Sequence, residues 1–279
     1  MKVFVTGHEG HIGHRIWDML KELPGEYAIV GYDIKSGDDI LNYDHLVEKM
    51  QGAEVVVHLA GIPHPDKRPL EAYIYQNLLG TANVAKAAYA AGARRMIYAS
   101  STAWYGCDIN GKLLPDYLPI DEMHPPAAPG RYEGGLKHYP VVKVMAEQVL
   151  AYYGSNHMLQ TVALRFGPAN YKPQQFGEGV FDWRAVPNWD YRRGCMWANV
   201  NPDKAAQAIK LAIDSPLEFW YEPFNIVDRY VPEGVSIREF CEQEYPGKLR
   251  EDFIESDADA LITPRKAMEI LGYVPSEER

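Results

Sequence analysis

Tyr139 and Lys143 stand four positions apart in a segment, residues 139–153, whose apolar residues recur with helical spacing up to Gly154. Residues i and i+4 share one helix face, so the phenol and the ammonium can meet on one substrate. A free phenol has a pKa near ~10. Lowering it to ~7 takes on the order of 4 kcal/mol of preferential stabilisation of the phenolate, part of which a nearby ammonium supplies. Such a tyrosine is a general base at neutral pH. Taken alone, the same spacing is also typical of an amphipathic surface pair.

A glycine-rich turn, residues 6–13, follows a short apolar run and opens a helical pattern. Its glycines let the backbone approach a pyrophosphate, whose charge the helix N-terminus favours. Asp33 ends the next apolar run, at about the 20-residue distance from Gly10 at which an acidic group reaches an adenosine ribose. Together these features predict a dinucleotide site. The carboxylate favours NAD over NADP, a preference that Lys35 weakens; the alternative is a tight turn that binds nothing.

Three histidines of this turn, His8, His11 and His14, invite a metal site, because imidazoles three positions apart can face one ion. They are interleaved with the glycines that a phosphate would need, and no neighbouring carboxylate and cysteine set completes a metal site. Contact with solvent or with the dinucleotide is therefore the favoured interpretation, and no metal is predicted.

Ser101 leaves the carboxyl end of a predicted strand, residues 95–100. Parallel sheets place their ligands at that edge, so the Ser101 hydroxyl can hold a substrate oxygen. A single serine here is more often a turn residue. Its occurrence together with the dinucleotide turn and the Tyr139–Lys143 pair favours a catalytic group of three.

Alternating strand and helix patterns position these residues. Strands are predicted at 2–6, 27–33, 54–59, 95–100 and 161–165, and helices at 12–23, 46–50, 70–91 and 139–153. This alternation predicts a doubly wound α/β fold with a mainly parallel sheet, because each right-handed crossover needs its own helix. Residues 110–138, rich in proline and glycine, predict a long irregular connection. Beyond residue 166 the pattern loosens, with helices expected at 202–214, after Ser236 and from Thr263-Pro264 to Gly272, and a strand at 224–227.

Composition excludes several other classes. The chain has 279 residues, 47% hydrophobic, with a net charge of −10 and no basic run, so nucleic acid is an unexpected partner. Its three cysteines are far apart and form no Cys-x-x-Cys pair, which fits a reducing cytoplasm. No apolar run approaches the ~18 residues of a membrane span, so the sequence predicts a cytoplasmic protein without membrane partners.

The sequence resembles the extended short-chain dehydrogenase/reductases, specifically the NAD-dependent epimerase/dehydratase family. The resemblance covers nearly the whole chain and rests on the glycine turn, Asp33, His58-Leu59-Ala60-Gly61, Asn77, the Ser100–Gly106 run, Tyr139-x-x-x-Lys143, Leu164-Arg165 and the closing Leu271-Gly272-Tyr273. It implies a Rossmann-type domain over 1–166. Residues 167–279 would form a small substrate lobe and return to complete the sheet. It also implies a homodimer formed through helices 70–91 and 139–153.

The resemblance implies a role for each site residue. Tyr139 would move the proton, Ser101 would orient the substrate hydroxyl, and Lys143 would bond the nicotinamide ribose. The implied cofactor contacts, besides Tyr139 and Lys143, are Gly7, Gly10, His11, Ile12, Gly13, Asp33, Asp39, Ile40, Leu59, Ala60, Gly61, Asn77, Ala99, Phe166 and Gly167.

Departures from the family pattern bear on the substrate. Relatives that handle nucleotide sugars commonly carry an aromatic-aromatic-Asn run where this chain reads Phe166-Gly167-Pro168. The usual diphosphate handle is thus missing, and the chain looks more like the compact members that oxidise free sugars or sugar acids, including uronate dehydrogenases. Those tend to show Ser-Asn-His where Ser101-Thr102-Ala103 stands, and a serine at Pro63.

The leading hypothesis is hydride transfer from a sugar or sugar-acid hydroxyl to NAD. The first alternative is a nucleotide-sugar 4-epimerase or dehydratase with tightly held NAD. The second is a non-catalytic NAD-binding regulator. Four arginines could bind an anionic group of the substrate, although ordinary salt bridges explain them equally well: Arg165, Arg184, Arg192 and Arg193. Four aromatic residues could stack on a sugar face, although packing within the lobe explains them equally well: Trp104, Phe181, Trp183 and Trp189.

Overall fold

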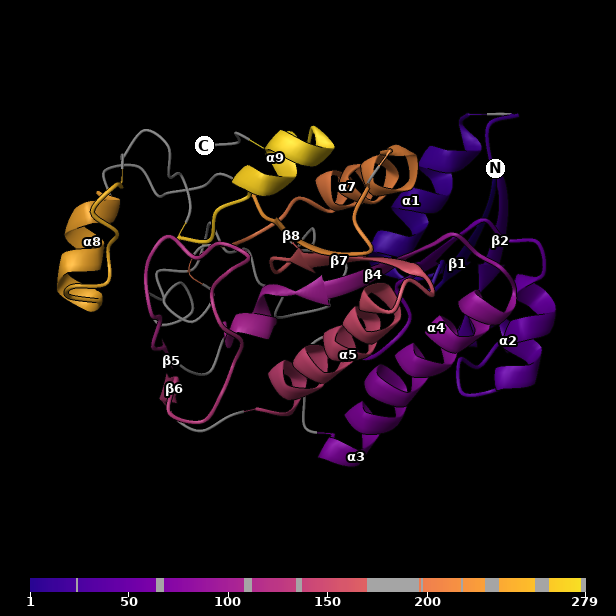
Figure 1. Ribbon diagram of the computed structural model, residues 1–279, viewed down its shortest axis with the longest axis horizontal. Coiled ribbons are helices and arrows are strands. Elements are labelled where there is room, and N and C mark those ends of the chain that lie inside the picture. The colour runs from indigo at the N-terminus through magenta and orange to yellow at the C-terminus, as the bar shows by residue number, and fades with distance from the viewer. Residues whose placement is uncertain are drawn as a thin grey trace, which may run out of the picture.

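The structure, a computed structural model, describes residues 1–23, 25–63, 68–107, 112–133, 137–169, 196, 198–216, 218–228, 236–253 and 261–276. Its central feature is a six-stranded, entirely parallel sheet in the order β2-β1-β3-β4-β7-β8 (Figure 1). The strands are β1 (Lys2–Thr6), β2 (Ala28–Tyr32), β3 (Val55–His58), β4 (Arg95–Ser101), β7 (Gln160–Phe166) and β8 (Tyr221–Ile226). The predicted doubly wound α/β fold is confirmed.

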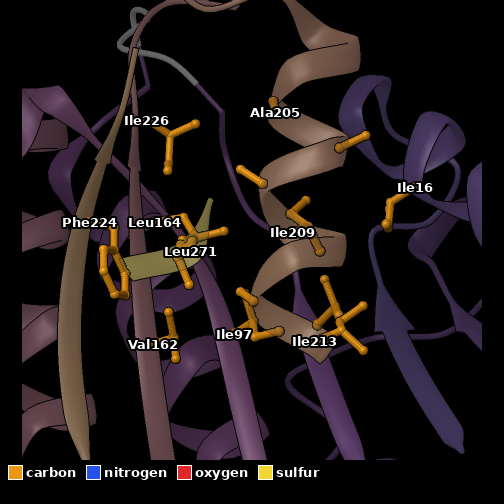
Figure 2. Packing of buried hydrophobic residues seen from close by; sticks show 14 of the residues in the cluster. Ile16, Ile97, Val162, Leu164, Ala205, Ile209, Ile213, Phe224, Ile226 and Leu271 are labelled. Carbon is orange, nitrogen blue, oxygen red and sulfur yellow. The ribbon is translucent and has the colours of Figure 1, made fainter. Parts of the chain in front are cut away.

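Helices cover both faces of the sheet (Figure 1). One face carries α1 (His11–Lys21), α7 (Pro202–Asp214) and α9 (Arg265–Leu271); the other carries α2 (Tyr43–Met50), α3 (Leu70–Tyr73), α4 (Gly80–Ala90) and α5 (His138–Ser155). Successive strand residues point to opposite faces, so Val55 and Val57 enter one core while Val56 enters the other. Figure 2 shows the first core, where Ile209 and Ile213 of α7 pack over Val162 of β7 and its neighbours.

The strand order places a topological switch at β1. The chain leaves β1 to form β2 on one side and returns to form β3 on the other side. The connections from neighbouring strands thus diverge at the carboxyl end of β1, which opens the crevice where sheets of this kind bind ligands. The glycine turn begins at that end.

The predicted helix over 70–91 is divided in the structure. A π-helical stretch, η2 (Ile74–Leu79), separates α3 from α4. This local widening carries the buried amide of Asn77, which is bonded to the loop after β3. Periodicity alone could not show it, because both helix types bury one face.

Gly154 does not end α5 as expected, since the helix continues to Ser155. A Cβ at Gly154 would lie 2.5 Å from the carbonyl oxygen of Trp220, so this glycine permits close packing against the chain entering β8. The last helix also begins one residue later than predicted. Pro264 is its N-cap, while the Thr263 hydroxyl accepts a hydrogen bond from the Arg265 amide.

Two predicted caps are confirmed. The Ser236 hydroxyl accepts a hydrogen bond from the Glu239 amide at the start of α8 (Ile237–Glu244). Gly272 ends α9 in the left-handed conformation, with φ of 71°. Helix α7 has the predicted bounds.

A third hydrophobic core lies at the end of the molecule that carries α8 (Figure 1). The predicted irregular connection contains two short antiparallel strands, β5 (Lys112–Leu113) and β6 (Tyr132–Glu133). Leu118 and Ile120 form isolated bridges with Leu249 and Ile262, so this connection packs against the C-terminal part. No helix in the described ranges is long and apolar enough to cross a membrane.

Candidate functional site

The glycine turn is shaped by close backbone contacts. Gly7 has φ of 72°, and a Cβ there would lie 2.7 Å from the amide nitrogen of Ala60. A Cβ at Gly13 would lie 2.1 Å from the carbonyl oxygen of Gly7. Gly10 caps α1 without a side-chain hydrogen bond, and the first turn of α1 has no acidic residue. His11 and Ile12 form the start of α1, and a helix N-terminus that begins at a glycine and carries no carboxylate in its first turn suits a bound diphosphate.

Asp33 is buried and held on both sides. Its Oδ1 accepts from the Lys35 amide and its Oδ2 from the Glu9 amide, both at 3.0 Å. A carboxylate has about four acceptor positions, so capacity remains for the hydroxyls of a ribose. The Glu9 contact ties Asp33 to the glycine turn, and the Lys35 ammonium bonds the Glu9 carbonyl at 2.7 Å. These bonds orient the predicted ribose acceptor before any ligand arrives.

Asp39 and Ile40 follow β2 at the same edge. The Asp39 carboxylate accepts from the Leu41 amide at 2.9 Å, and its backbone carbonyl accepts from the Tyr32 hydroxyl at 2.8 Å. Ile40 is buried, and a Cβ at Gly80 would come within 2.4 Å of its Cδ1. Their implied contacts with the cofactor stay predictions.

The loop after β3 lies directly beside the glycine turn. Leu59 donates its amide proton to the Thr6 carbonyl at 3.1 Å, and Ala60 is the close neighbour of Gly7. Asn77 holds the far end of this loop, since its Oδ1 accepts from the Ile62 amide at 2.7 Å and its Nδ2 donates to the Ile62 carbonyl at 3.0 Å. Both amide groups are thus engaged, which favours an indirect contribution of Asn77 to cofactor binding.

Gly61 adopts φ of 143° in that loop, and a Cβ there would lie 2.9 Å from Oδ1 of Asn77. A side chain at this position would therefore displace the amide that holds the loop. The predicted residues Leu59, Ala60 and Gly61 thus lie in one loop at the carboxyl end of β3, and Asn77 holds this loop through its two hydrogen bonds to Ile62.

Tyr139 and Lys143 project from the first turns of α5 toward the end of β4. The Tyr139 ring is buried in a cluster with Ile62, Tyr73 and Ala103. The Lys143 ammonium lies 5.5 Å from the centroid of the Tyr139 ring. It donates to the Tyr98 hydroxyl at 3.0 Å and to the Ala99 carbonyl at 2.7 Å. Ala99, a predicted cofactor contact, thus positions Lys143.

Burial lowers the pKa of Lys143 to about 7, and the negative charge of Glu147 partly opposes this shift. The ammonium and amine forms of Lys143 therefore interconvert near neutral pH. The chemistry at Tyr139 becomes sensitive to pH through its neighbour as well as through its own proton.

The two adjacent serines have different partners. Ser101 caps a short 3₁₀ helix, η3 (Thr102–Tyr105), where its Oγ accepts from the Ala103 amide at 3.1 Å. Because that bond uses a lone pair, the Ser101 proton is available for donation to a substrate oxygen. Ser100 instead donates to the buried carboxylate of Glu147.

Phe166 is the last residue of β7, and Gly167 follows it. Phe166 packs into the core beneath α7, and the Gly167 amide donates to the Ile226 carbonyl at 3.1 Å. A Cβ at Gly167 would lie 1.6 Å from the Ala198 carbonyl oxygen, so the close approach of the 198–199 backbone requires glycine here. Their implied contacts with the cofactor stay predictions.

Arg165 lies in the interior. It is 2% exposed and forms a 2.8 Å ion pair with Glu147, which is fully buried. Its guanidinium also donates to the Tyr105 hydroxyl at 2.8 Å and lies 3.5 Å from the centroid of the Trp104 ring. The salt-bridge interpretation therefore holds for Arg165, and Trp104 stacks on protein. The other candidates for substrate contact lie outside the described residues: Arg184, Arg192, Arg193, Phe181, Trp183 and Trp189.

Glu147 is the residue that the sequence analysis missed. It lies one helical turn beyond Lys143 and accepts hydrogen bonds from Ser100, Arg165 and Tyr221. The i, i+4 spacing that picks out Tyr139 and Lys143 continues to Glu147, and this continuation was the available signal.

The histidines of the glycine turn do not gather around one point. Within the described ranges, no group of three or more His, Cys, Asp or Glu side chains is placed to hold a metal ion. The His8 ring lies 4.8 Å from that of Trp17 and covers Gly31. Burial, followed by the charge of Arg15, lowers the pKa of His11 to about 4.

His58 makes a pH-dependent contribution to stability. Burial lowers its pKa from 6.5 to about 3, so between these values the unfolded chain binds a proton that the native ring does not. We expect the free energy of unfolding to fall with decreasing pH, by on the order of 1.4 kcal/mol per pH unit from this residue. Urea unfolding at pH 7, 6 and 5 measures the slope. His58→Gln should be less stable at pH 7 but show a shallower slope, and equal slopes would contradict the assignment.

Residues 3–181 match the profile of the NAD dependent epimerase/dehydratase family. The chain belongs to this family. Membership confirms the resemblance noted in the sequence, and it makes NAD the cofactor, as predicted. The glycine turn, the carboxylate-free first turn of α1 and the buried Asp33 fit that cofactor.

Three relatives illustrate the range of the family. L-arabinose 1-dehydrogenase (NAD(P)(+)) of Haloferax volcanii is 30% identical over 60% of this chain and 66% of its own length. Uronate dehydrogenase of Pseudomonas syringae pv. tomato is 23% identical over 71% of this chain and 66% of its own length. The chain thus spans just under two thirds of both. The solved structure of MoeE5 in complex with UDP-glucuronic acid and NAD superposes with a TM-score of 0.70 at 22% identity, over 100% of this chain and 95% of that one. This likeness shows a shared fold.

Proposed function

We propose that the chain is an NAD-dependent oxidoreductase that oxidises a hydroxyl of a sugar or sugar acid. The observation that carries the proposal is the placement of the Lys143 ammonium, 5.5 Å from the Tyr139 ring and fixed by two hydrogen bonds at the carboxyl edge of the sheet. A phenol beside a buried cation at the ligand-binding edge is suited to proton abstraction. The glycine turn lies at the same edge.

Each residue of the group has one task. Tyr139, as phenolate, removes the proton of the substrate hydroxyl and becomes a phenol. The Lys143 ammonium stabilises the phenolate before that transfer. The Ser101 hydroxyl donates a hydrogen bond to the same substrate oxygen, which it can do because its Oγ already accepts from Ala103. The glycine turn and Asp33 would hold NAD, which would supply the acceptor for the hydride of the substrate carbon, so that this carbon would be oxidised to a carbonyl.

A free sugar or sugar acid is the substrate class that the chain supports best. Phe166-Gly167-Pro168 lacks the asparagine that commonly accompanies a nucleotide diphosphate in relatives, and the backbone around Gly167 is closed by residues 198–199. Relatives named as arabinose and uronate dehydrogenases point the same way. MoeE5, solved with a UDP-sugar, keeps nucleotide-sugar epimerisation as the second candidate. A 4,6-dehydratase is disfavoured, since Ala103-Trp104 stands where an Asp-Glu pair is usual.

A substrate panel tests the proposal. The purified protein is incubated with NAD and, separately, with free aldoses, uronates and UDP-sugars, while NADH absorbance and sugar products are followed. We expect net NADH with a free sugar or uronate. Interconversion of UDP-sugars without net NADH would overturn the proposal in favour of the epimerase. NAD binding with no turnover in any arm would favour a non-catalytic regulator.

The proposal extends to how the chain is organised. Residues 1–166 would form the cofactor domain, and residues 167–279 would supply both a substrate lobe and the last strand of the sheet. The pairing of β8 with β7 supports this division. A cytoplasmic location suits the buried, free thiol of Cys241.

A homodimer would bury an apolar surface on α3, η2 and α5. Its exposed side chains are Leu70, Ile74, Tyr75, Leu79, Met145 and Tyr152. Tyr75 and Tyr152 are 57% and 59% exposed, so charging both should cost the folded monomer little. We expect the Tyr75→Glu/Tyr152→Glu double variant to sediment as a monomer and the wild type as a dimer. Val274→Glu, at an exposed position elsewhere, is the control; an unchanged mass for the double variant would contradict this interface.

A further inference from the structure

Lys143 has three N–H donors in its charged form, and two of them are already used. One is bonded to the Ala99 carbonyl, a backbone group that any residue would present. The other is bonded to the hydroxyl of Tyr98, a side chain on β4 that is 2% exposed. The single remaining donor is the one that can serve a ligand. Its direction depends on whether the Tyr98 hydroxyl stays in place as an acceptor.

Hydrogen counting shows how that hydroxyl is held. Thr81 donates its one hydroxyl proton to the Asn77 carbonyl at 2.6 Å, so its oxygen acts only as an acceptor toward other side chains. His58 Nε2 lies 3.0 Å from the same oxygen and must therefore carry the proton. The Tyr98 hydroxyl also interacts with Thr81, and by the same count it is the donor. Its lone pairs then remain for Lys143.

The rest of the chain of bonds obeys the same polarity. Since burial keeps His58 neutral and Nε2 holds its proton, Nδ1 is an acceptor. The Thr6 hydroxyl, 2.7 Å away, donates to it and in turn accepts from the Ala60 amide at 3.3 Å. Every donor in this path has one acceptor. The path links the end of β1, where the glycine turn begins, to Lys143.

We propose that Tyr98 is a positioning residue for the reaction: its hydroxyl, oriented by Thr81 and His58, accepts a hydrogen bond from Lys143 and turns the remaining N–H toward Tyr139 and the ribose of the bound dinucleotide. The inference rests on the proposed roles of Tyr139 and Lys143. Tyr98 itself touches neither substrate nor cofactor in this scheme. Burial raises its pKa well above the ordinary value, so it remains a protonated phenol and exchanges no proton.

Other groups around Lys143 also influence its charge. Glu147 lies one turn away on α5, Tyr139 lies one turn earlier, and His58 of β3 is close enough to interact electrostatically with the ammonium. Tyr73 of α3 contacts Tyr139, and Arg165 of β7 and Tyr221 of β8 bond Glu147. Tyr105 of η3 is bonded in turn to Arg165. None of them changes when Tyr98 is replaced by phenylalanine, which also retains the ring 4.6 Å from the ammonium.

Titration of Lys143 in the cofactor-free protein tests the proposal without turnover. The protein is labelled with ¹³C at the lysine Cε atoms, and NMR follows their chemical shifts as the pH changes. The Lys143 signal is identified by its absence from the spectrum of Lys143→Arg. Removing an acceptor from the ammonium favours the neutral amine, so we expect the Lys143 pKa to fall by about one unit in Tyr98→Phe. Above the pKa, this leaves about tenfold less ammonium.

Matched variants separate positioning from a general effect of a lost hydroxyl. Tyr273 is a buried tyrosine in the core on the opposite face of the sheet, and Tyr273→Phe should leave the Lys143 pKa unchanged. Thr81→Val, which lacks the hydroxyl that orients Tyr98, should lower the Lys143 pKa. Thr81→Ser, which keeps a hydroxyl, should leave the Lys143 pKa at its wild-type value. An unchanged Lys143 pKa in Tyr98→Phe, or an equal shift in Tyr273→Phe, overturns the proposal.

Activity provides an independent reading once a substrate is known. The alkaline limb of kcat/KM should move to lower pH in Tyr98→Phe by the same amount as the NMR titration, and a fall at all pH values without such movement would indicate a merely structural role. Failure of the proposed function looks different: Lys143 would titrate as described, yet no sugar would reduce NAD.

Discussion

Replacing Tyr139 by phenylalanine is expected to lower kcat by about 10²- to 10⁴-fold, the range that general acid–base catalysis contributes. The ring packs with Tyr73 and Ala103 in a buried cluster, and phenylalanine preserves that packing. The variant loses the atom that accepts the substrate proton, while the glycine turn and Asp33 are untouched. Steady-state rates with the sugar found in the substrate panel measure the loss, and NADH fluorescence measures cofactor affinity.

Cofactor binding should stay close to that of the wild type in Tyr139→Phe. Tyr152→Phe is the matched control, because it removes a hydroxyl from an exposed tyrosine of the same helix. A Tyr139→Phe variant that binds NADH normally and retains full activity would remove Tyr139 from catalysis. It would also revive the non-catalytic interpretation of the family fold, since a fold does not guarantee turnover.

The second large effect is expected from the buried pair of Glu147 and Arg165. Arg165→Met would leave the Glu147 carboxylate buried without its cation, and Glu147→Gln would leave the guanidinium without its anion. Removing one partner of a buried ion pair typically costs about 3–5 kcal/mol. We expect each single variant to lose stability in this range, measured by urea unfolding at pH 7.

The double variant distinguishes pairing from simple loss of packing. Glu147→Gln/Arg165→Met has no unpaired charge. Its loss of stability should therefore be smaller than the sum of the two single losses, by a coupling energy of about 1–3 kcal/mol. The exposed pair of Lys210 and Asp214 is the control, and Lys210→Met should cost less than about 1 kcal/mol. Strictly additive losses at Glu147 and Arg165 would contradict a coupled pair.

Glu147 also connects stability to chemistry. Its charge opposes the effect of burial on Lys143, and its carboxylate bonds Ser100, the residue before Ser101. Arg165, one of the sequence candidates for substrate contact, is used instead to neutralise Glu147 beneath the site. The residue that supports the site was therefore one turn beyond the recognised motif, and the arginine expected to meet the substrate supports the core.

Sequence patterns anticipated the parts of this protein that are encoded locally. The glycine turn requires small residues and an adjacent helix, and Asp33 follows at the spacing set by one βαβ unit, so both could be read from composition and distance along the chain. Alternating apolar runs likewise predicted the parallel strands, because a strand buried on both faces has a distinctive composition. The helix expected at about 202–214 is α7 (Pro202–Asp214).

Contacts between distant segments were decided only by the tertiary structure. Gly154 looked like a helix end, yet it lies inside α5, where the Trp220 backbone comes too close for a side chain. The π-helical widening at Asn77 occurs where its side chain makes two hydrogen bonds to Ile62, a residue of the loop after β3. Local spacing specifies which side chains share a face. Only the folded sheet specifies which buried charges and hydroxyls form hydrogen bonds or ion pairs with one another. Burial excludes water, so these groups must pair within the protein.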